Sequence, residues 1–151
     1  MRNGILILHH ISIGVFFGSL VAALVCKVLA ERKGERDAIK YSIASLIALD
    51  RFVTAPSAIG VTLTGIALIA VLGPDVLWML WLQLLLLLWV AAAAAAHFLL
   101  VPELQALGRL TAEGQVEDYL SRAQRWNKWA ALMLLVPILS YGLAIVKPNY
   151  E

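Results

Sequence analysis

Two adjacent histidines, His9 and His10, are the residues of this 151-residue chain best suited to chemistry. They lie a few residues inside a long apolar stretch, where a polar side chain is costly unless it is neutral, paired or bound to a ligand. A neutral imidazole can be an axial ligand to the iron of a haem-like macrocycle. It can equally form a structural hydrogen bond with a neighbouring helix. The sequence leaves both roles open.

His10 also begins a row of small residues spaced four apart, which we call the small-residue ridge: His10, Gly14, Gly18, Ala22 and Cys26. Residues at this spacing share one face of a helix, and small side chains let a neighbouring backbone come close. We therefore predict that the ridge points into a helix bundle and that Gly14 and Gly18 make room for a flat ring beside His10. His9 lies about 100° away around the helix.

Composition defines the class of protein. Hydrophobic residues make up 62% of the chain and charged residues 15%, with a mean hydropathy of +0.85. A membrane-spanning helix needs about 20 mostly apolar residues, and four segments meet or approach that length: 5–29, 52–72, 76–101 and 129–146. The sequence thus predicts an all-α, polytopic membrane protein whose residues 1–151 form a single four-helix transmembrane domain. The net charge of +2 is small and confined to loops, so we expect no nucleic-acid partner. The small-residue faces instead predict contact with membrane lipids and with other integral membrane subunits.

The positions of Lys and Arg predict the orientation. Residues 27–51 hold six of them and residues 102–128 hold four, whereas the turn Gly73-Pro74-Asp75 holds none. By the positive-inside rule, both termini lie outside, in the periplasm, and the chain lies in the inner (cytoplasmic) membrane. Residues 37–49 and 115–126 are amphipathic, so they predict short helices on the cytoplasmic side, either interfacial or extending the spans.

A second group of polar residues is predicted near the cytoplasmic ends of the spans: Asp50, Arg51, Thr54, His97 and Asn127. An arginine at this depth could bind a carboxylate or a lipid phosphate. Alternatively, Asp50 and Arg51 only position the helix at the interface. His10 and His97 are separated by roughly 20 Å in depth, so they cannot bind the same iron.

Several short motifs follow one another along the chain: Arg51-Phe52-Val53-Thr54-Ala55-Pro56, Leu63-Thr64-Gly65, Trp81-Leu82-Gln83, His97 and Val146-Lys147-Pro148. With the early histidine pair, this order resembles the HemJ-type membrane protoporphyrinogen oxidases and their uncharacterised relatives. The resemblance implies a four-helix protein associated with haem b, its first-helix histidine at His9 or His10 and its third-helix histidine at His97. Leu85 and Lys128 stand where those enzymes carry a lysine and an acidic residue. The chain therefore looks more like the uncharacterised relatives.

Two functions follow from this sequence. The first is a non-catalytic integral membrane subunit or scaffold that packs within a larger complex and holds a haem, porphyrin or lipid near His10, with His10 as the iron ligand where haem is bound. The second is a haem-b-dependent membrane redox enzyme of the protoporphyrinogen oxidase type. The sequence assigns no catalytic residue.

Overall fold

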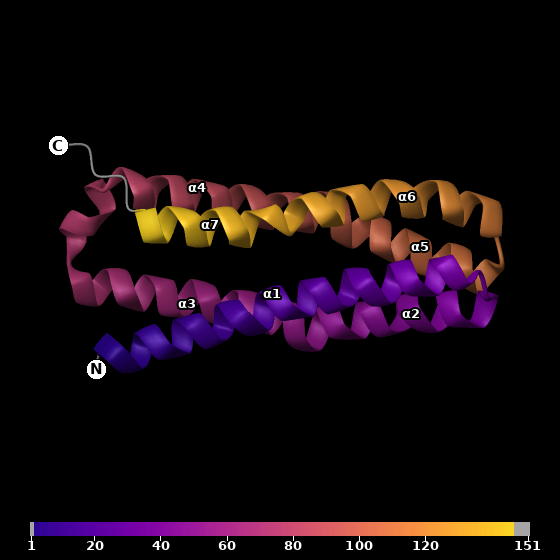
Figure 1. Cartoon of the computed structure of the whole chain (residues 1–151), viewed down its shortest axis with the longest axis horizontal. Coiled ribbons are helices and arrows are strands. Elements are labelled where there is room, and N and C mark those ends of the chain that lie inside the picture. The colour runs from indigo at the N-terminus through magenta and orange to yellow at the C-terminus, as the bar shows by residue number, and fades with distance from the viewer. Residues whose placement is uncertain (1, 147–151) are drawn as a thin grey trace.

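Four long helical columns run side by side in the computed structural model, which describes residues 2–146 (Figure 1). The first column is α1 (Arg2–Lys33), and the second joins α2 (Arg36–Leu49), the π-helical segment η1 (Asp50–Thr54) and α3 (Ala55–Leu72). The short 3-10 helix η2 (Pro74–Trp78) leads to the third column, which consists of α4 (Leu80–Ala95), the π-helical segment η3 (Ala96–Leu100) and α5 (Val101–Glu113). The fourth column consists of α6 (Val116–Met133) and α7 (Leu135–Val146).

A glycine ends or joins the columns at each of the three reversals of the chain. Gly34, Gly73 and Gly114 have φ angles of 72°, 98° and 77°. This region of backbone conformation is open to glycine at no steric cost and rarely to residues with a Cβ atom. The turns are therefore specified locally, and Pro74 directly after Gly73 starts a new helical segment where its missing N–H costs nothing.

Each column is longer than the hydrocarbon core of a bilayer is thick. Within the described residues, four helical stretches of 32, 37, 34 and 30 residues are apolar enough to cross a membrane. At about 1.5 Å per residue they measure roughly 45 to 55 Å, against about 30 Å for the hydrocarbon core of a bilayer. Every column is therefore longer than the hydrocarbon core requires. This confirms the predicted all-helical membrane protein with four helices long and apolar enough to span a bilayer. Residues 37–49 lie in α2, which continues through η1 into α3 in one helical column.

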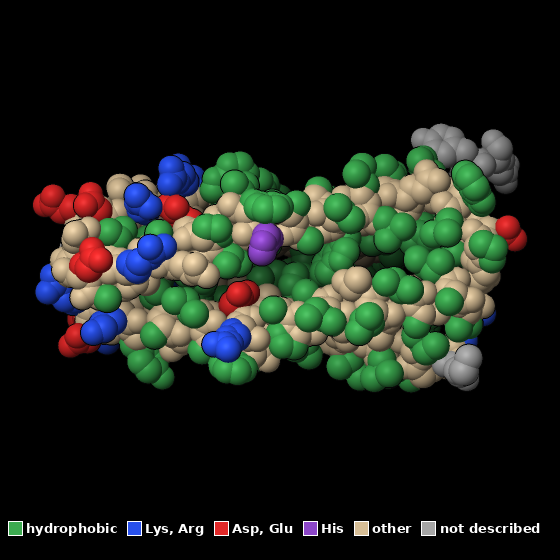
Figure 2. Space-filling model, turned by 180° about the vertical axis from the view of Figure 1, so that it is seen from behind, with side chains coloured by type: hydrophobic (Ala, Val, Ile, Leu, Met, Phe, Trp, Pro, Cys, Tyr) green, Lys and Arg blue, Asp and Glu red, His purple; other side chains and the backbone are tan. Residues whose placement is uncertain are grey.

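The charged side chains gather in one half of the molecule. Figure 2 shows Lys, Arg, Asp and Glu side chains concentrated there, which we call the charged half, while hydrophobic side chains cover most of the other, apolar half. The buried hydrophobic core lies in the charged half as well, between α2, α5 and α6: Ile39, Ile43, Leu46, Leu104, Leu107, Tyr119, Ala123 and Trp126. The charged half thus packs like a small water-soluble bundle, and the apolar half leaves its hydrophobic faces to lipid.

Candidate functional site

His9 lies at the contact between α1 and α3. Its Nδ1 is 2.8 Å from Thr64 Oγ1, and Thr64 Oγ1 donates its own hydrogen to Gly60 O at 2.6 Å. The threonine oxygen therefore accepts from His9 Nδ1–H. A Cβ atom at Gly65 would lie 3.4 Å from His9 Cε1, so this glycine accommodates the imidazole edge. The half-buried His9 has the structural role that the sequence left open for the histidine pair.

His10 points the other way, and the prediction that it faces the bundle interior is wrong. Its side chain is exposed, and its Nδ1 is 2.8 Å from Leu6 O of the same helix. Because a carbonyl oxygen only accepts, Nδ1 carries a proton, and in the neutral imidazole Nε2 then has a free lone pair. Gly14 and Gly18 are exposed with it, and nothing lies within 4 Å of a Cβ atom built on either.

The opposite face of α1 explains this orientation. Ser19 Oγ lies 3.0 Å from Thr54 Oγ1 of η1, and both side chains are buried. A Cβ atom at Gly60 of α3 would lie 2.9 Å from Ser12 Oγ, so the two backbones approach closely there. Hydroxyl and imidazole groups have no water to bind inside a bilayer, so they pair across the α1–α3 contact. The small-residue ridge is consequently turned outward.

The five residues of the predicted inner polar group do not form one site. Thr54 bonds Ser19, Arg51 lies over the ring of Phe52 at 5.6 Å, and the exposed His97 packs edge-on against Phe98 at 5.0 Å. No side-chain hydrogen bond or ion pair joins any two of the five within residues 2–146. Asp50, Arg51 and Thr54 lie in η1 and His97 lies in η3. Such single-turn π-helical segments within α-helices frequently accompany functional sites.

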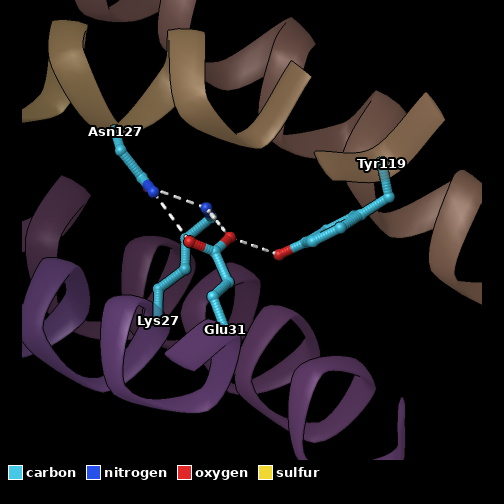
Figure 3. Close-up of polar contacts among 4 residues, drawn as sticks. All are labelled: Lys27, Glu31, Tyr119 and Asn127. Atoms are coloured by element: carbon cyan, nitrogen blue, oxygen red, sulfur yellow. Dashed lines mark hydrogen bonds and ion pairs between the residues drawn. The ribbon is translucent and has the colours of Figure 1, made fainter. Parts of the chain in front are cut away.

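Asn127, the fifth residue, belongs to a network around a buried lysine (Figure 3). Lys27 of α1 has no exposed side-chain surface and forms an ion pair with Glu31, one turn further along the helix. Lys27 Nζ also donates to Asn127 Oδ1 of α6 at 2.7 Å. Glu31 in turn accepts from Asn127 Nδ2 at 2.7 Å and from Tyr119 Oη at 2.6 Å. We call these four residues the Lys27 network.

Aromatic rings complete the surroundings of the ammonium group. Lys27 Nζ lies 5.0 Å from the ring centroid of Trp126 and 5.8 Å from that of Tyr119. Trp126 is fixed by donating its Nε1–H to Leu100 O at 3.1 Å. A cation over an aromatic face is attracted by the negative face of the ring, more strongly when water is excluded. The lysine charge is thus balanced by a carboxylate, an amide oxygen and two rings.

The Lys27 network links the first column to the last within the charged half, beside the buried core that contains Tyr119 and Trp126. Sequence reasoning used Lys27 only as a topological charge, although a lysine and a glutamate four residues apart share one helix face. That spacing was the available signal. The partners Tyr119 and Asn127 lie about ninety to a hundred residues away and required the packing of α6 on α1.

The fold and these contacts define a multi-pass integral membrane protein. A family model described as "Predicted integral membrane protein (DUF2269)" matches residues 4–148. Because the match covers nearly the whole sequence, the chain belongs to this family, whose function is unknown. No curated protein and no solved structure matches the chain. None of these findings links it to the HemJ-type oxidases, so the resemblance to that family is without support.

Proposed function

We propose that this chain is a non-catalytic subunit of a larger integral membrane assembly, in which the small-residue ridge of α1 packs against a helix of another membrane protein. The observation that carries the proposal is the outward orientation of the ridge, with open space above Gly14 and Gly18. Lipid chains are as apolar as leucine, so small side chains do not bind lipid more strongly than large apolar ones do. A neighbouring helix gains close backbone contact there.

The charge distribution supports an orientation for this subunit. Ten Lys and Arg residues lie in the two connections at the charged end, and none lies in Gly73-Pro74-Asp75 at the other end. A bacterial inner membrane retains such basic connections on the cytoplasmic side. We accordingly place the charged half in the cytoplasm and both termini in the periplasm.

Filling the ridge tests the subunit role. Gly18→Leu adds a branched side chain to the ridge at an exposed position, where nothing lies within 4 Å of a Cβ atom. We expect the wild-type protein, extracted in mild detergent, to migrate as a particle larger than the monomer with its detergent, and Gly18→Leu to migrate as the monomer. The control is Ile66→Leu on an exposed face of α3. A monomeric wild-type protein, or equal particle sizes in all three, would contradict the proposal.

A second candidate function, haem binding, is favoured by the orientation of His10. The hydrogen bond from Nδ1 to Leu6 O fixes the ring and leaves Nε2 available, the arrangement usual for a histidine that binds a metal. His10 would hold the iron, and Gly14 and Gly18 would lie against the flat ring. A bound haem b would supply one-electron transfer. The haem-b-dependent redox enzyme of the protoporphyrinogen oxidase type, the second function that the sequence suggested, would need this chemistry.

The visible absorption spectrum tests haem binding. If haem is bound at this face, the purified protein shows a Soret band, His10→Ala removes it, and His9→Ala retains most of it because His9 faces Thr64. Equal loss in both variants would contradict the assignment to His10. Rescue of a strain that lacks its protoporphyrinogen oxidase would support the enzyme and contradict the non-catalytic role.

A further inference from the structure

An open groove of about 440 Å³ runs along the charged half between α2 and α5. Its lining is mostly apolar or small, and its polar members include two cations, Lys40 on α2 and Arg109 on α5. No aspartate or glutamate lines it. The groove residues on α2 are Lys40, Ile43, Ala44 and Ile47, and those on α5 are Gln105, Gly108, Arg109, Thr111 and Ala112.

The two cations of the groove differ from most of their neighbours in having no partner. Around them, Arg36 donates to Gly114 O at 2.9 Å, Lys33 pairs with Glu35 at 3.5 Å, and Arg122 and Arg125 both pair with Glu103. Lys40 and Arg109 are exposed, and across the part of the chain that the structure describes neither makes an ion pair or a hydrogen bond through its side chain. Two unpaired positive charges therefore flank an apolar floor.

The close approach of α2 and α5 explains the floor. A Cβ atom at Gly108 would lie 3.3 Å from Ile47 Cδ1 and 3.7 Å from Ile43 Cγ2, so only a residue without a side chain leaves the isoleucines this much room. Ile47 remains 39% exposed in spite of this contact. An exposed isoleucine beside two alanines offers a surface that an apolar group can cover.

The groove begins beside the bilayer. Ile47 precedes η1 by three residues, and η1 leads directly into the apolar α3. The third apolar segment ends at residue 101, and Gln105 follows four residues later. Four residues correspond to about 6 Å along a helix. The headgroup layer of a bilayer is roughly 5 to 8 Å thick on each side. The near end of the groove therefore lies at headgroup depth, and the side chain of Arg109 leans toward the bilayer because α5 begins there.

We propose that this groove binds an anionic phospholipid of the surrounding membrane. Its phosphate lies at Arg109, the outer part of an anionic headgroup extends toward Lys40, and the glycerol backbone and upper acyl chain cover Ile47 and Ala44. An anionic amphiphile matches both the charged rim and the apolar floor. Inorganic phosphate would use only the rim, and an uncharged apolar helix would use only the floor.

A purified, detergent-solubilised protein can test this directly. The binding of phosphatidylglycerol is measured by native mass spectrometry and by the shift in unfolding temperature, with phosphatidylcholine and inorganic phosphate in parallel. We expect phosphatidylglycerol to bind the protein more tightly, and to raise its unfolding temperature more, than either phosphatidylcholine or inorganic phosphate. A contribution of about 1 kcal/mol per basic residue near a membrane surface predicts that Lys40→Gln with Arg109→Gln weakens phosphatidylglycerol binding about 25-fold.

A charge-matched variant provides the control. Arg32→Gln with Lys128→Gln removes two exposed cations from the same half of the molecule and none from the groove. We expect it to bind phosphatidylglycerol within about twofold of the wild type. Equal weakening in both double variants would mean general attraction to a basic surface and would overturn the proposal. Equal stabilisation by inorganic phosphate, or no preference over phosphatidylcholine, would overturn it too.

Discussion

Replacing Glu31 by glutamine should destabilise the bundle strongly, because it leaves the buried charge of Lys27 without its carboxylate. Lys27 has no exposed side-chain surface, and its remaining partners would be Asn127 Oδ1 and the rings of Trp126 and Tyr119. Removing one member of a buried ion pair costs about 3 to 5 kcal/mol. Because the amide and the rings still stabilise the ammonium group, we expect the lower end of this range, about 3 kcal/mol.

This magnitude can be measured as a change in unfolding temperature. For a domain of this size, 1 kcal/mol corresponds to about 2 to 4 °C, so Glu31→Gln should unfold roughly 6 to 12 °C below the wild type in the same detergent. Far-ultraviolet circular dichroism follows the loss of helix. The control is Glu35→Gln, since Glu35 pairs with Lys33 at 3.5 Å on the surface and such pairs contribute about 1 kcal/mol or less.

The double variant separates charge pairing from simple loss of packing. In Lys27→Met with Glu31→Gln both charges are absent, and an apolar chain of similar length fills the space of the lysine. We expect this variant to be more stable than Glu31→Gln alone, because no unpaired charge is buried. A loss in the double variant equal to the sum of the two single losses would refute the coupling. So would an unfolding temperature for Glu31→Gln within 1 °C of the wild type.

Three further outcomes are expected. Tyr119→Phe removes the hydroxyl that donates to Glu31 at 2.6 Å, and since hydrogen bonds to charged groups contribute about 1.5 to 3 kcal/mol, the unfolding temperature should fall by roughly 3 to 12 °C; an unchanged value would contradict the contact. Gly114→Ala places a Cβ atom at a φ of 77° and 3.0 Å from Arg36 Nη2, so thermal unfolding should show a loss of about 1 to 2 kcal/mol, whereas Gly4→Ala should cost nothing. In a Cys26→Ser background, a cysteine at Asp75 should react with an impermeant reagent added outside and a cysteine at Gly34 should not; the reverse pattern would mean the opposite orientation.

The four spans could be predicted because about 20 apolar residues in sequence are a strong local signal, and the three glycine turns separate them. Which face of α1 packs against its neighbours could not be predicted in the same way. Small residues spaced four apart suggested one inner face, while His9, Ser12 and Ser19 form a second, polar face. The second face packs on α3 and η1 because Thr64 of α3 and Thr54 of η1 offer hydrogen-bond partners there. Those partners lie 55 and 35 residues away, and the pattern of one helix does not contain them.

The Lys27 network was missed for a related reason. A single lysine near the end of an apolar stretch commonly extends its amine to the membrane surface. In this chain α6 covers that position with Trp126 and Asn127, so the lysine is enclosed. Asn127 was singled out from the sequence as a polar residue near the charged end, but its partners Lys27 and Glu31 come from α1 and not from η1 or η3.

Site-specific photo-crosslinking in native membranes tests the subunit role most directly. A photoreactive amino acid at Gly14 lies on the small-residue ridge, and one at Ile59 lies on an exposed face of α3 at nearly the same depth, since Gly60 contacts Ser12. We predict a discrete protein adduct from position 14, lost when Gly18→Leu is added, and only lipid adducts from position 59. Lipid adducts alone from both positions would contradict the account.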